Sequence, residues 1–288
     1  MPVVVADIAF TRHEGRRGTA WLRRSYAMFR QHRLAWIGLL LAYYVLLLVI
    51  EAVPFIGSIV APLVKPVLSV GFLAGAWTQE RGGRPAISMV FRGFGANVRA
   101  LLPLGLVFVV GISIALGATA LVDGGRLLDL LYGAGPSAED DSAAAARHVE
   151  QVLAMPRVQL AMLFGALCAL PTLLALWWAP ALVVFQDARL ATALRTSLRA
   201  AVGNWRAAAR YALAIFMFGI VVPSLITALL ALLVPPPLNA TIAALVVLPY
   251  VAFFVATLHI SDYVSYRDVF HWEEAAPETT LASETTPK

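Results

Sequence analysis

Six long apolar runs dominate this sequence of 288 residues. Each run has about 20 residues or more, which is the length that a helix needs to cross a bilayer core of about 30 Å. Hydrophobic residues make up 60% of the chain and charged residues 14%, whereas about a quarter of the residues in a soluble domain are charged. The runs therefore predict an all-α polytopic membrane protein with six transmembrane helices, at residues 34–53, 55–78, 101–122, 158–185, 211–233 and 240–260.

The polar stretches divide the chain into three predicted parts. These are a polar, loosely held N-terminal segment, a membrane domain and a disordered tail rich in Glu, Thr, Ser and Pro, at residues 1–17, 18–272 and 273–288. The membrane domain carries one long insertion at 123–157, with a short apolar patch and then an acidic trio at 139–141. An alanine-rich helix is predicted after the trio, with Pro156 as its stop signal.

Three basic amphipathic stretches precede the odd-numbered runs, and the clearest of them is Gln186–Tyr211. At 100° per residue its apolar side chains fall on one helix face and its arginines on the opposite face. The apolar face holds Leu190, Leu194, Leu198, Ala201, Val202 and Trp205, and the basic face holds Arg195, Arg199, Arg206 and Arg210. Such a pattern is typical of a helix lying in the lipid headgroup region.

The other two stretches lie at 19–33 and about 87–99, so we predict three basic interfacial helices in all. In the second stretch, Arg92 and Arg99 lie off the apolar face. Basic side chains beside a membrane are attracted to anionic lipids. We therefore expect these two arginines, together with the four on the third stretch, to contact the headgroups of membrane lipids that are anionic.

A weak internal repeat connects these stretches to the runs. Each stretch closes on an amide residue followed two positions later by arginine, in Gln31-His32-Arg33, Asn97-Val98-Arg99 and Asn204-Trp205-Arg206. Each even-numbered run continues into an acidic residue, namely Glu80, Asp187, and either Asp262 or Asp268. The pattern indicates three units, each with a basic helix and a two-span hairpin.

The distribution of arginine predicts the orientation. Arginines gather in the N-terminal segment and in the loops after the second and fourth runs, whereas the opposite side carries only Arg126, Arg147 and Arg157. By the positive-inside rule, both termini are cytoplasmic and the insertion at 123–157 is periplasmic, in a bacterial inner membrane. Because the basic residues flank apolar runs, the net charge of +5 favours lipid rather than nucleic acid as a partner.

The sequence has few groups of residues of the kinds that form catalytic or metal sites. No two of the five histidines are four residues apart, and the single cysteine, Cys168, excludes a disulfide framework and a cysteine metal site. The sequence also has no serine in a nucleophile-elbow setting and no paired carboxylates inside the runs. We therefore expect no enzymatic activity, no cofactor and no metal.

One formal charge, Lys65, lies well inside a predicted span, between Pro62 and Pro66. Ionisable residues inside a membrane commonly mark functional sites. Glu51 is the nearest candidate counter-charge, so one hypothesis is a polar site formed by Lys65 and Glu51. The other interpretation is that Lys65 extends its stem towards the outer surface without any function.

Several short motifs resemble those of a known bacterial family. They are the proline-rich turn between the first two spans, Trp21-Leu22-Arg23-Arg24, Phe29-Arg30, Trp178-Ala179-Pro180-Ala181 and the run from Tyr263 to Phe270. Over roughly 18–270, apart from much of the insertion, the chain resembles uncharacterised six-helix inner-membrane proteins. More distantly, it is similar to the membrane domain attached to some glycerophosphodiester phosphodiesterases. The resemblance implies a fold and a location, but no site residue, because none of the motifs is catalytic.

Two functions from different classes remain open. The first is non-enzymatic membrane organisation through binding of lipid, a protein partner or a second copy of the chain. The alternative is a permease for a small or amphiphilic solute, based on Lys65 and the proline-broken spans. A polar cavity at mid-membrane depth would favour the permease. A membrane-embedded hydrolase lacks any supporting constellation.

Overall fold

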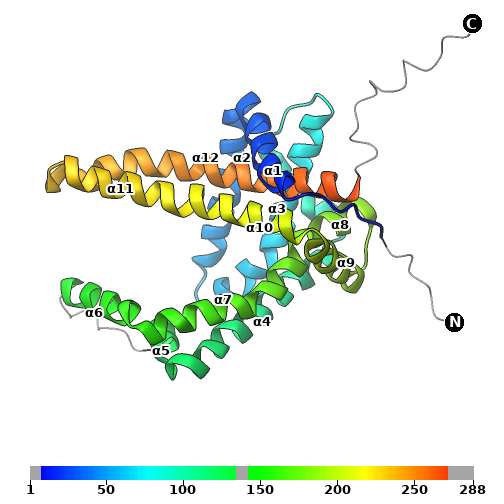
Figure 1. Cartoon of the computed structure of the whole chain (residues 1–288). Helices are drawn as coiled ribbons and strands as arrows, with labels where there is room; N and C mark the ends of the chain where they lie inside the picture. Colours follow the sequence, from blue (N-terminus) through cyan, green and yellow to red (C-terminus); the bar gives the residue numbers. More distant parts are fainter. Residues whose placement is uncertain (1–7, 134–141, 272–288) are drawn as a thin grey trace, which may run out of the picture.

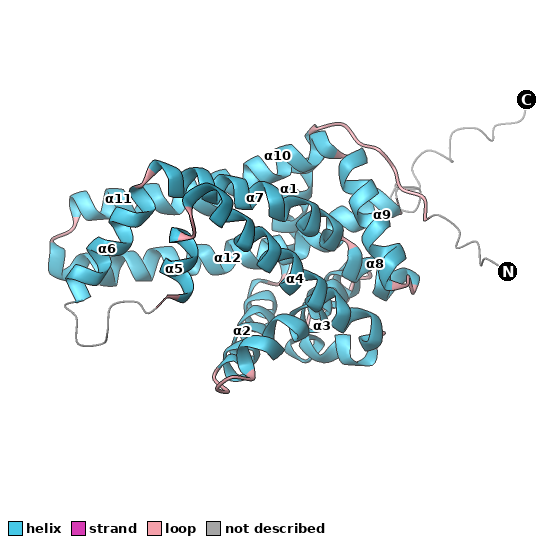
Figure 2. Cartoon of the chain, turned by 90° about the horizontal axis from the view of Figure 1, so that it is seen from below, coloured by secondary structure: helices cyan, strands magenta, loops and turns pink. Residues whose placement is uncertain are grey.

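The computed structural model describes residues 8–133 and 142–271, and in that part of the chain all regular structure is helical (Figures 1 and 2). This confirms the all-α prediction. The elements are α1 (Arg16–Gln31), α2 (Arg33–Glu51), α3 (Gly57–Glu80), η1 (Ile87–Gly95), α4 (Val98–Asp123), α5 (Arg126–Tyr132), α6 (Ser142–Ala154), α7 (Pro156–Trp177), α8 (Ala179–Gln186), α9 (Leu190–Gly203), α10 (Trp205–Phe216), η2 (Met217–Val221), α11 (Val222–Leu233) and α12 (Pro236–Phe270).

Six helical segments are long and apolar enough to cross a membrane, as the sequence predicts. They are Arg33–Glu51, Gly57–Glu80, Val98–Asp123, Pro156–Gln186, Trp205–Leu233 and Leu238–Phe270. The fifth begins at Trp205 rather than at 211, and the sixth continues to Phe270 rather than ending near 260. The extension of the sixth segment is stabilised by packing, because Tyr263, Tyr266 and Val269 are all buried in the protein core.

The three basic amphipathic stretches take three different forms. The first is α1, whose buried face packs against α10 and α12 instead of lying free for lipid. The second is the 3-10 helix η1, which lies so close to α3 that a Cβ at Gly93 would be 1.8 Å from the carbonyl oxygen of Val67. The third is not one continuous helix, because α9 ends at Gly203 and α10 begins at Trp205.

The N-terminal segment is held more firmly over residues 8–15 than the prediction of a loose segment allows. The backbone N–H of Thr11 donates a hydrogen bond of 2.8 Å to the carbonyl of Val269, which attaches this segment to the end of α12. Helix α1 begins at Arg16, three residues before the predicted start at Thr19. Residues 1–7 and the predicted disordered tail at 273–288 lie outside the described residues.

The insertion forms two short helices. The apolar patch becomes α5 and the alanine-rich stretch becomes α6, while the acidic trio at 139–141 lies outside the described residues. Pro156 opens α7, as suits a residue with no N–H to donate at a helix start. Leu127, Val152 and Val158 form a small apolar cluster that joins α5, α6 and α7.

The helices are arranged as hairpins that meet at one end of the molecule. The pair α11 and α12 forms a long arm, and α4 and α7 form a second packed pair (Figure 1). The N-terminal helix α1 lies against α10 and α12, where the main core contains its largest fully buried side chains. This junction of hairpins positions the polar residues described next.

Candidate functional site

An aromatic cluster fixes α1 in place. Trp21 is fully buried and meets Trp177, Trp178 and Tyr211 edge-on, with ring centroids 5.9–6.3 Å apart. Gly18, one turn earlier, allows this contact, because a Cβ there would be 2.1 Å from the carbonyl oxygen of Ala207. The apolar face of α1 therefore packs in the protein core on α10 and α12, while its opposite face, which includes Arg23 and Arg30, is exposed.

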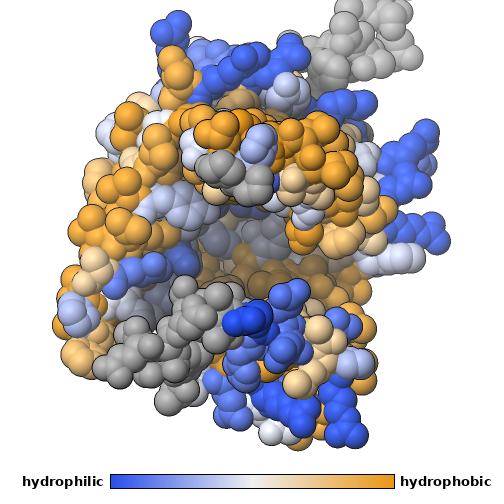
Figure 3. Space-filling view, turned by 90° about the vertical axis from the view of Figure 1, so that its left-hand side faces the viewer, coloured by the Kyte–Doolittle hydropathy of each residue, from blue (hydrophilic) through white to orange (hydrophobic). Residues whose placement is uncertain are grey.

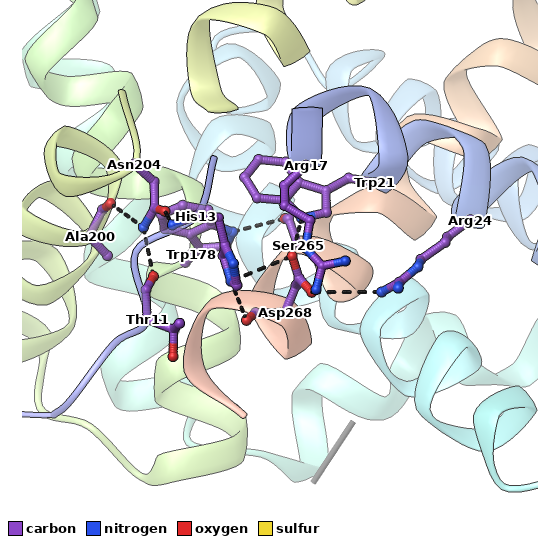
Figure 4. Close-up of polar contacts among 10 residues, drawn as sticks. All are labelled: Thr11, His13, Arg17, Trp21, Arg24, Trp178, Ala200, Asn204, Ser265 and Asp268. Carbon is purple, nitrogen blue, oxygen red and sulfur yellow. Dashed lines mark hydrogen bonds and ion pairs between the residues drawn. The ribbon is translucent and has the colours of Figure 1, made fainter. Parts of the chain in front are cut away.

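Asp268 lies next to this cluster and contacts basic side chains of α1 and of the segment before it (Figure 4). Its carboxylate accepts a 2.8 Å hydrogen bond from the indole N–H of Trp21. The guanidinium groups of Arg17 and Arg24 lie 3.1 and 3.6 Å from the same carboxylate, whose side chain is 1% exposed. His13 Nε2 lies 3.5 Å from the carboxylate. We call these five residues the Asp268 cluster.

The Asp268 cluster is connected to the break between α9 and α10 through Asn204. The Asn204 side-chain oxygen accepts the backbone N–H of His13 at 2.7 Å, and its amide group donates to the carbonyl oxygens of Thr11 and Ala200 at 3.0 Å (Figure 4). His13 in turn contacts the Asp268 carbonyl oxygen at 2.8 Å. The buried amide thus attaches the break between α9 and α10 to the N-terminal segment.

Comparable polar contacts join the start and the end of each predicted repeat unit. In the first unit Gln79 donates to the side chain of Gln31 at 2.9 Å, and in the second Asn97 donates to Asp187 at 3.2 Å. In the third unit, His13 bridges Asn204 and Asp268. Among the described residues, the amide and acidic positions of the predicted repeat meet directly only in the second unit, because Gln31 contacts Gln79 rather than Glu80, and Asn204 and Asp268 are joined through His13 of the N-terminal segment. The three-unit interpretation stays a prediction.

A large apolar groove opens on one side of α10, with a volume of about 950 Å³. It lies among α7, α9, α10 and α12, and Figure 3 shows the molecule hollowed between apolar surfaces on this side. The lining is mostly aliphatic and aromatic: Tyr44, Leu170, Leu173, Leu174, Trp177, Ala201, Val202, Trp205, Ala208, Ala209, Tyr211, Ala212, Ile215, Val255, Leu258, His259 and Asp262.

Two ionisable side chains, His259 and Asp262, line this groove from α12. They are three residues apart and so share one helix face. The imidazole of His259 stacks on Phe72 with the ring centroids 4.0 Å apart, and Trp177 of α7 lines the same groove as Asp262. The groove is thus a long apolar surface with a small polar site on one wall.

A second hollow, which we call the basic hollow, adjoins the apolar groove across α10. Its volume is about 920 Å³, and it shares Trp205 and Ala209 with the apolar groove. Four arginines and one glutamate are among the residues that line it: Arg12, His13, Glu14, Gly15, Arg16, Trp205, Arg206, Ala209 and Arg210. Because Glu14 already pairs with Arg16 at 3.0 Å, the hollow carries an excess of positive charge.

The six arginines predicted to contact headgroups are all exposed, but the fold does not bring them to one place. Arg206 and Arg210 line the basic hollow together with Arg12 and Arg16, two arginines that the sequence prediction did not include. Arg199 lines a smaller depression of about 290 Å³ beside Phe10. The remaining three, Arg195, Arg92 and Arg99, lie on exposed surfaces of α9, η1 and α4.

The structure does not bring Lys65 and Glu51 together. Lys65 is half-buried in the continuous helix α3, and Glu51 is exposed at the end of α2. No ion pair joins them in the part of the chain that the structure describes. The α4 backbone packs on the proline-containing turn, since a Cβ at Gly105 would be 2.6 Å from the Pro62 carbonyl oxygen. A role for Lys65 stays a prediction without a partner residue.

The structure adds three residues that the sequence did not predict as site residues, although the repeat pattern had singled out Asp262 or Asp268. Asp268, His259 and Asp262 lie where the chain was interpreted as the end of a span and a polar helical extension. Their spacing on α12 is a usable signal, because Asp262 and Asp268 are six residues apart and so point to different sides of the helix. Among the described residues, no group of three His, Cys, Asp or Glu side chains is placed to hold a metal ion.

Comparison with known proteins yields one informative relative. The chain is 29% identical over 194 residues to a protein of Burkholderia thailandensis named as a probable inner membrane protein, which covers 66% of this chain and 67% of that protein. No family model matches the chain, and no solved structure matches it. Nothing here supports the more distant resemblance to phosphodiesterase membrane domains. The relative and the six apolar helices together support a multi-pass integral protein of the inner membrane.

Proposed function

We propose that this protein is a non-enzymatic component of the bacterial inner membrane that binds anionic lipid at the basic hollow. The observation that supports this proposal is the order of side chains along one face of α10. Along it, the spacing i, i+4, i+7, i+11 places Arg206 and Arg210 first, then the exposed apolar residue Leu213 and, at the start of η2, the exposed Met217. A headgroup on the arginines would therefore leave its acyl chains beside an apolar, exposed surface.

Electrostatics favours a phosphate-bearing headgroup in this hollow. Guanidinium groups bind phosphate through paired, charge-assisted hydrogen bonds. Each basic residue near an anionic leaflet contributes about 1 kcal/mol of attraction. Trp205, 62% exposed at the start of α10, has the amphipathic ring that is enriched where a membrane meets water. Cytoplasmic placement of this end, which the arginine distribution predicts, would put the hollow in the more anionic leaflet.

Lipid retention tests this proposal. Full-length protein is purified in a mild nonionic detergent, and the bound phosphatidylglycerol and cardiolipin are quantified by mass spectrometry. Replacing Arg12, Arg16, Arg206 and Arg210 with glutamine should reduce the retained anionic lipid several-fold. The matched control replaces Arg126 and Arg157, which are exposed and predicted to face the opposite side. Equal loss in both variants, or no loss in either, would contradict a specific site.

A permease remains the second candidate function, and the lining of the apolar groove limits the class of solute that it could carry. A groove lined mainly by aliphatic and aromatic side chains suits an amphiphilic solute better than a small hydrophilic one. His259 and Asp262, rather than Lys65, are the ionisable groups that such a solute would meet. Uptake of a labelled amphiphile into proteoliposomes, compared with protein-free vesicles, distinguishes transport from binding alone.

A further inference from the structure

The carboxylate of Asp262 lines the apolar groove without a cationic partner. Two other acidic residues at the ends of even spans, Asp268 and Glu80, differ from it. Asp268 has two arginines within 3.6 Å, and Glu80 lies 3.3 Å from the guanidinium of Arg267. Among the described residues, no arginine or lysine pairs with Asp262, and none lines the groove. An isolated charge in apolar surroundings is unfavourable unless a partner compensates it.

The groups around Asp262 include no arginine or lysine among the described residues, so a ligand could supply the compensating positive charge. From α7, the Trp177 ring lines the groove, and from α10 the Tyr211 hydroxyl forms a hydrogen bond of 2.5 Å with the Ser261 hydroxyl. From α12 itself, His259 stacks on Phe72. Trp177 and Tyr211 also lie parallel, with ring centroids 5.2 Å apart, so their aromatic surfaces flank this part of the groove.

We propose that the apolar groove binds an amphiphile with a primary ammonium group, which pairs with the Asp262 carboxylate while the apolar body lies along α7 and α10. The ammonium would donate charge-assisted hydrogen bonds to the carboxylate. Nearby indole and phenol rings favour a cation further. The volume of about 950 Å³ lies within the range of small-molecule sites. This inference is independent of the anionic-lipid proposal, which concerns the hollow across α10.

A long-chain amine and the alcohol of equal chain length form the direct test. Full-length protein in nonionic detergent is titrated with hexadecylamine or hexadecanol, and bound ligand is counted by native mass spectrometry. The wild-type protein should bind the amine roughly tenfold more tightly, because hydrogen bonds to charged groups are the stronger ones. Asp262→Asn should remove this preference and leave alcohol binding unchanged. Glu51→Gln, at an exposed carboxylate on α2, is the matched control and should keep the preference.

A second variant and a lipid analysis complete the experiment. Ala208→Phe, in the groove wall, should weaken binding of both ligands and tests the site even if Asp262→Asn folds poorly. If phosphatidylethanolamine is enriched in purified wild-type protein but not in Asp262→Asn, the ligand is a membrane lipid. If hexadecylamine binds without such enrichment, the ligand is a free amine. Equal affinity for amine and alcohol overturns the proposal, as does a preference that persists in Asp262→Asn. A second copy of the chain filling the groove would abolish amine binding and overturn it too.

Discussion

Two carboxylates on α12, Asp268 and Asp262, have opposite surroundings although they are only six residues apart. Asp268 accepts a hydrogen bond from the indole N–H of Trp21, and Asp262 lines the apolar groove together with Trp177. Asp268 also faces Arg17, Arg24 and His13, whereas no arginine or lysine in the described chain pairs with Asp262. The two sites therefore differ mainly in whether basic side chains lie next to the carboxylate.

The comparison separates a structural carboxylate from one available to a ligand. Asp268 lies near the C-terminal end of α12, where the helix dipole disfavours negative charge, so its arginines are needed to stabilise it. Together they attach the N-terminal segment and α1 to the last helix. Asp262 attaches nothing comparable, and it lines an open groove. The same substitution at both positions should therefore have different consequences.

Asp268→Asn should have the largest effect on stability. Asparagine keeps the size of the side chain and one acceptor for Trp21, but it leaves Arg17 and Arg24 facing a neutral group. Breaking a buried ion pair typically costs about 3–5 kcal/mol, and we expect about 3 kcal/mol because Arg24 is partly exposed. The free energy of unfolding in detergent measures this, and hydrogen exchange should rise first in α1. Unchanged exchange in α1 would contradict the role of Asp268 as its anchor.

Substitutions of the two arginines of the Asp268 cluster should lower the free energy of unfolding by different amounts. The Arg17 side chain is 23% exposed and 3.1 Å from the carboxylate, whereas the Arg24 side chain is 52% exposed and 3.6 Å away. Exposed ion pairs contribute about 0–1 kcal/mol, so Arg24→Gln should lower the free energy of unfolding by less than about 1 kcal/mol. Arg17→Gln should lower it more. The reverse order would show that Arg24 is the main partner of Asp268.

The sequence was sufficient to predict the six spans, because the length and apolar composition of a span are local properties. It was not sufficient for α1, since lipid and protein interior are both apolar. The face Gly18, Trp21, Ser25 and Phe29 that packs in the core follows the same helical period as a face turned to lipid. Nor could local patterns pair residues 13, 17 and 24 with 268, because these contacts depend on how the first and last helices pack.

Asp262→Asn should have the smallest effect on stability, and it tests the comparison most directly. The substitution keeps the shape of the side chain, while it removes a charge that no arginine or lysine among the described residues compensates. Replacing an unpaired charge in apolar surroundings with a neutral group relieves the cost of desolvation. In ligand-free protein the melting temperature should therefore be unchanged or higher, in contrast to the decrease expected for Asp268→Asn. A ligand that binds only the folded state raises the melting temperature, so hexadecylamine should stabilise the wild type and not the variant. If Asp262→Asn instead destabilises ligand-free protein as much as Asp268→Asn does, both carboxylates are structural and the distinction between them fails.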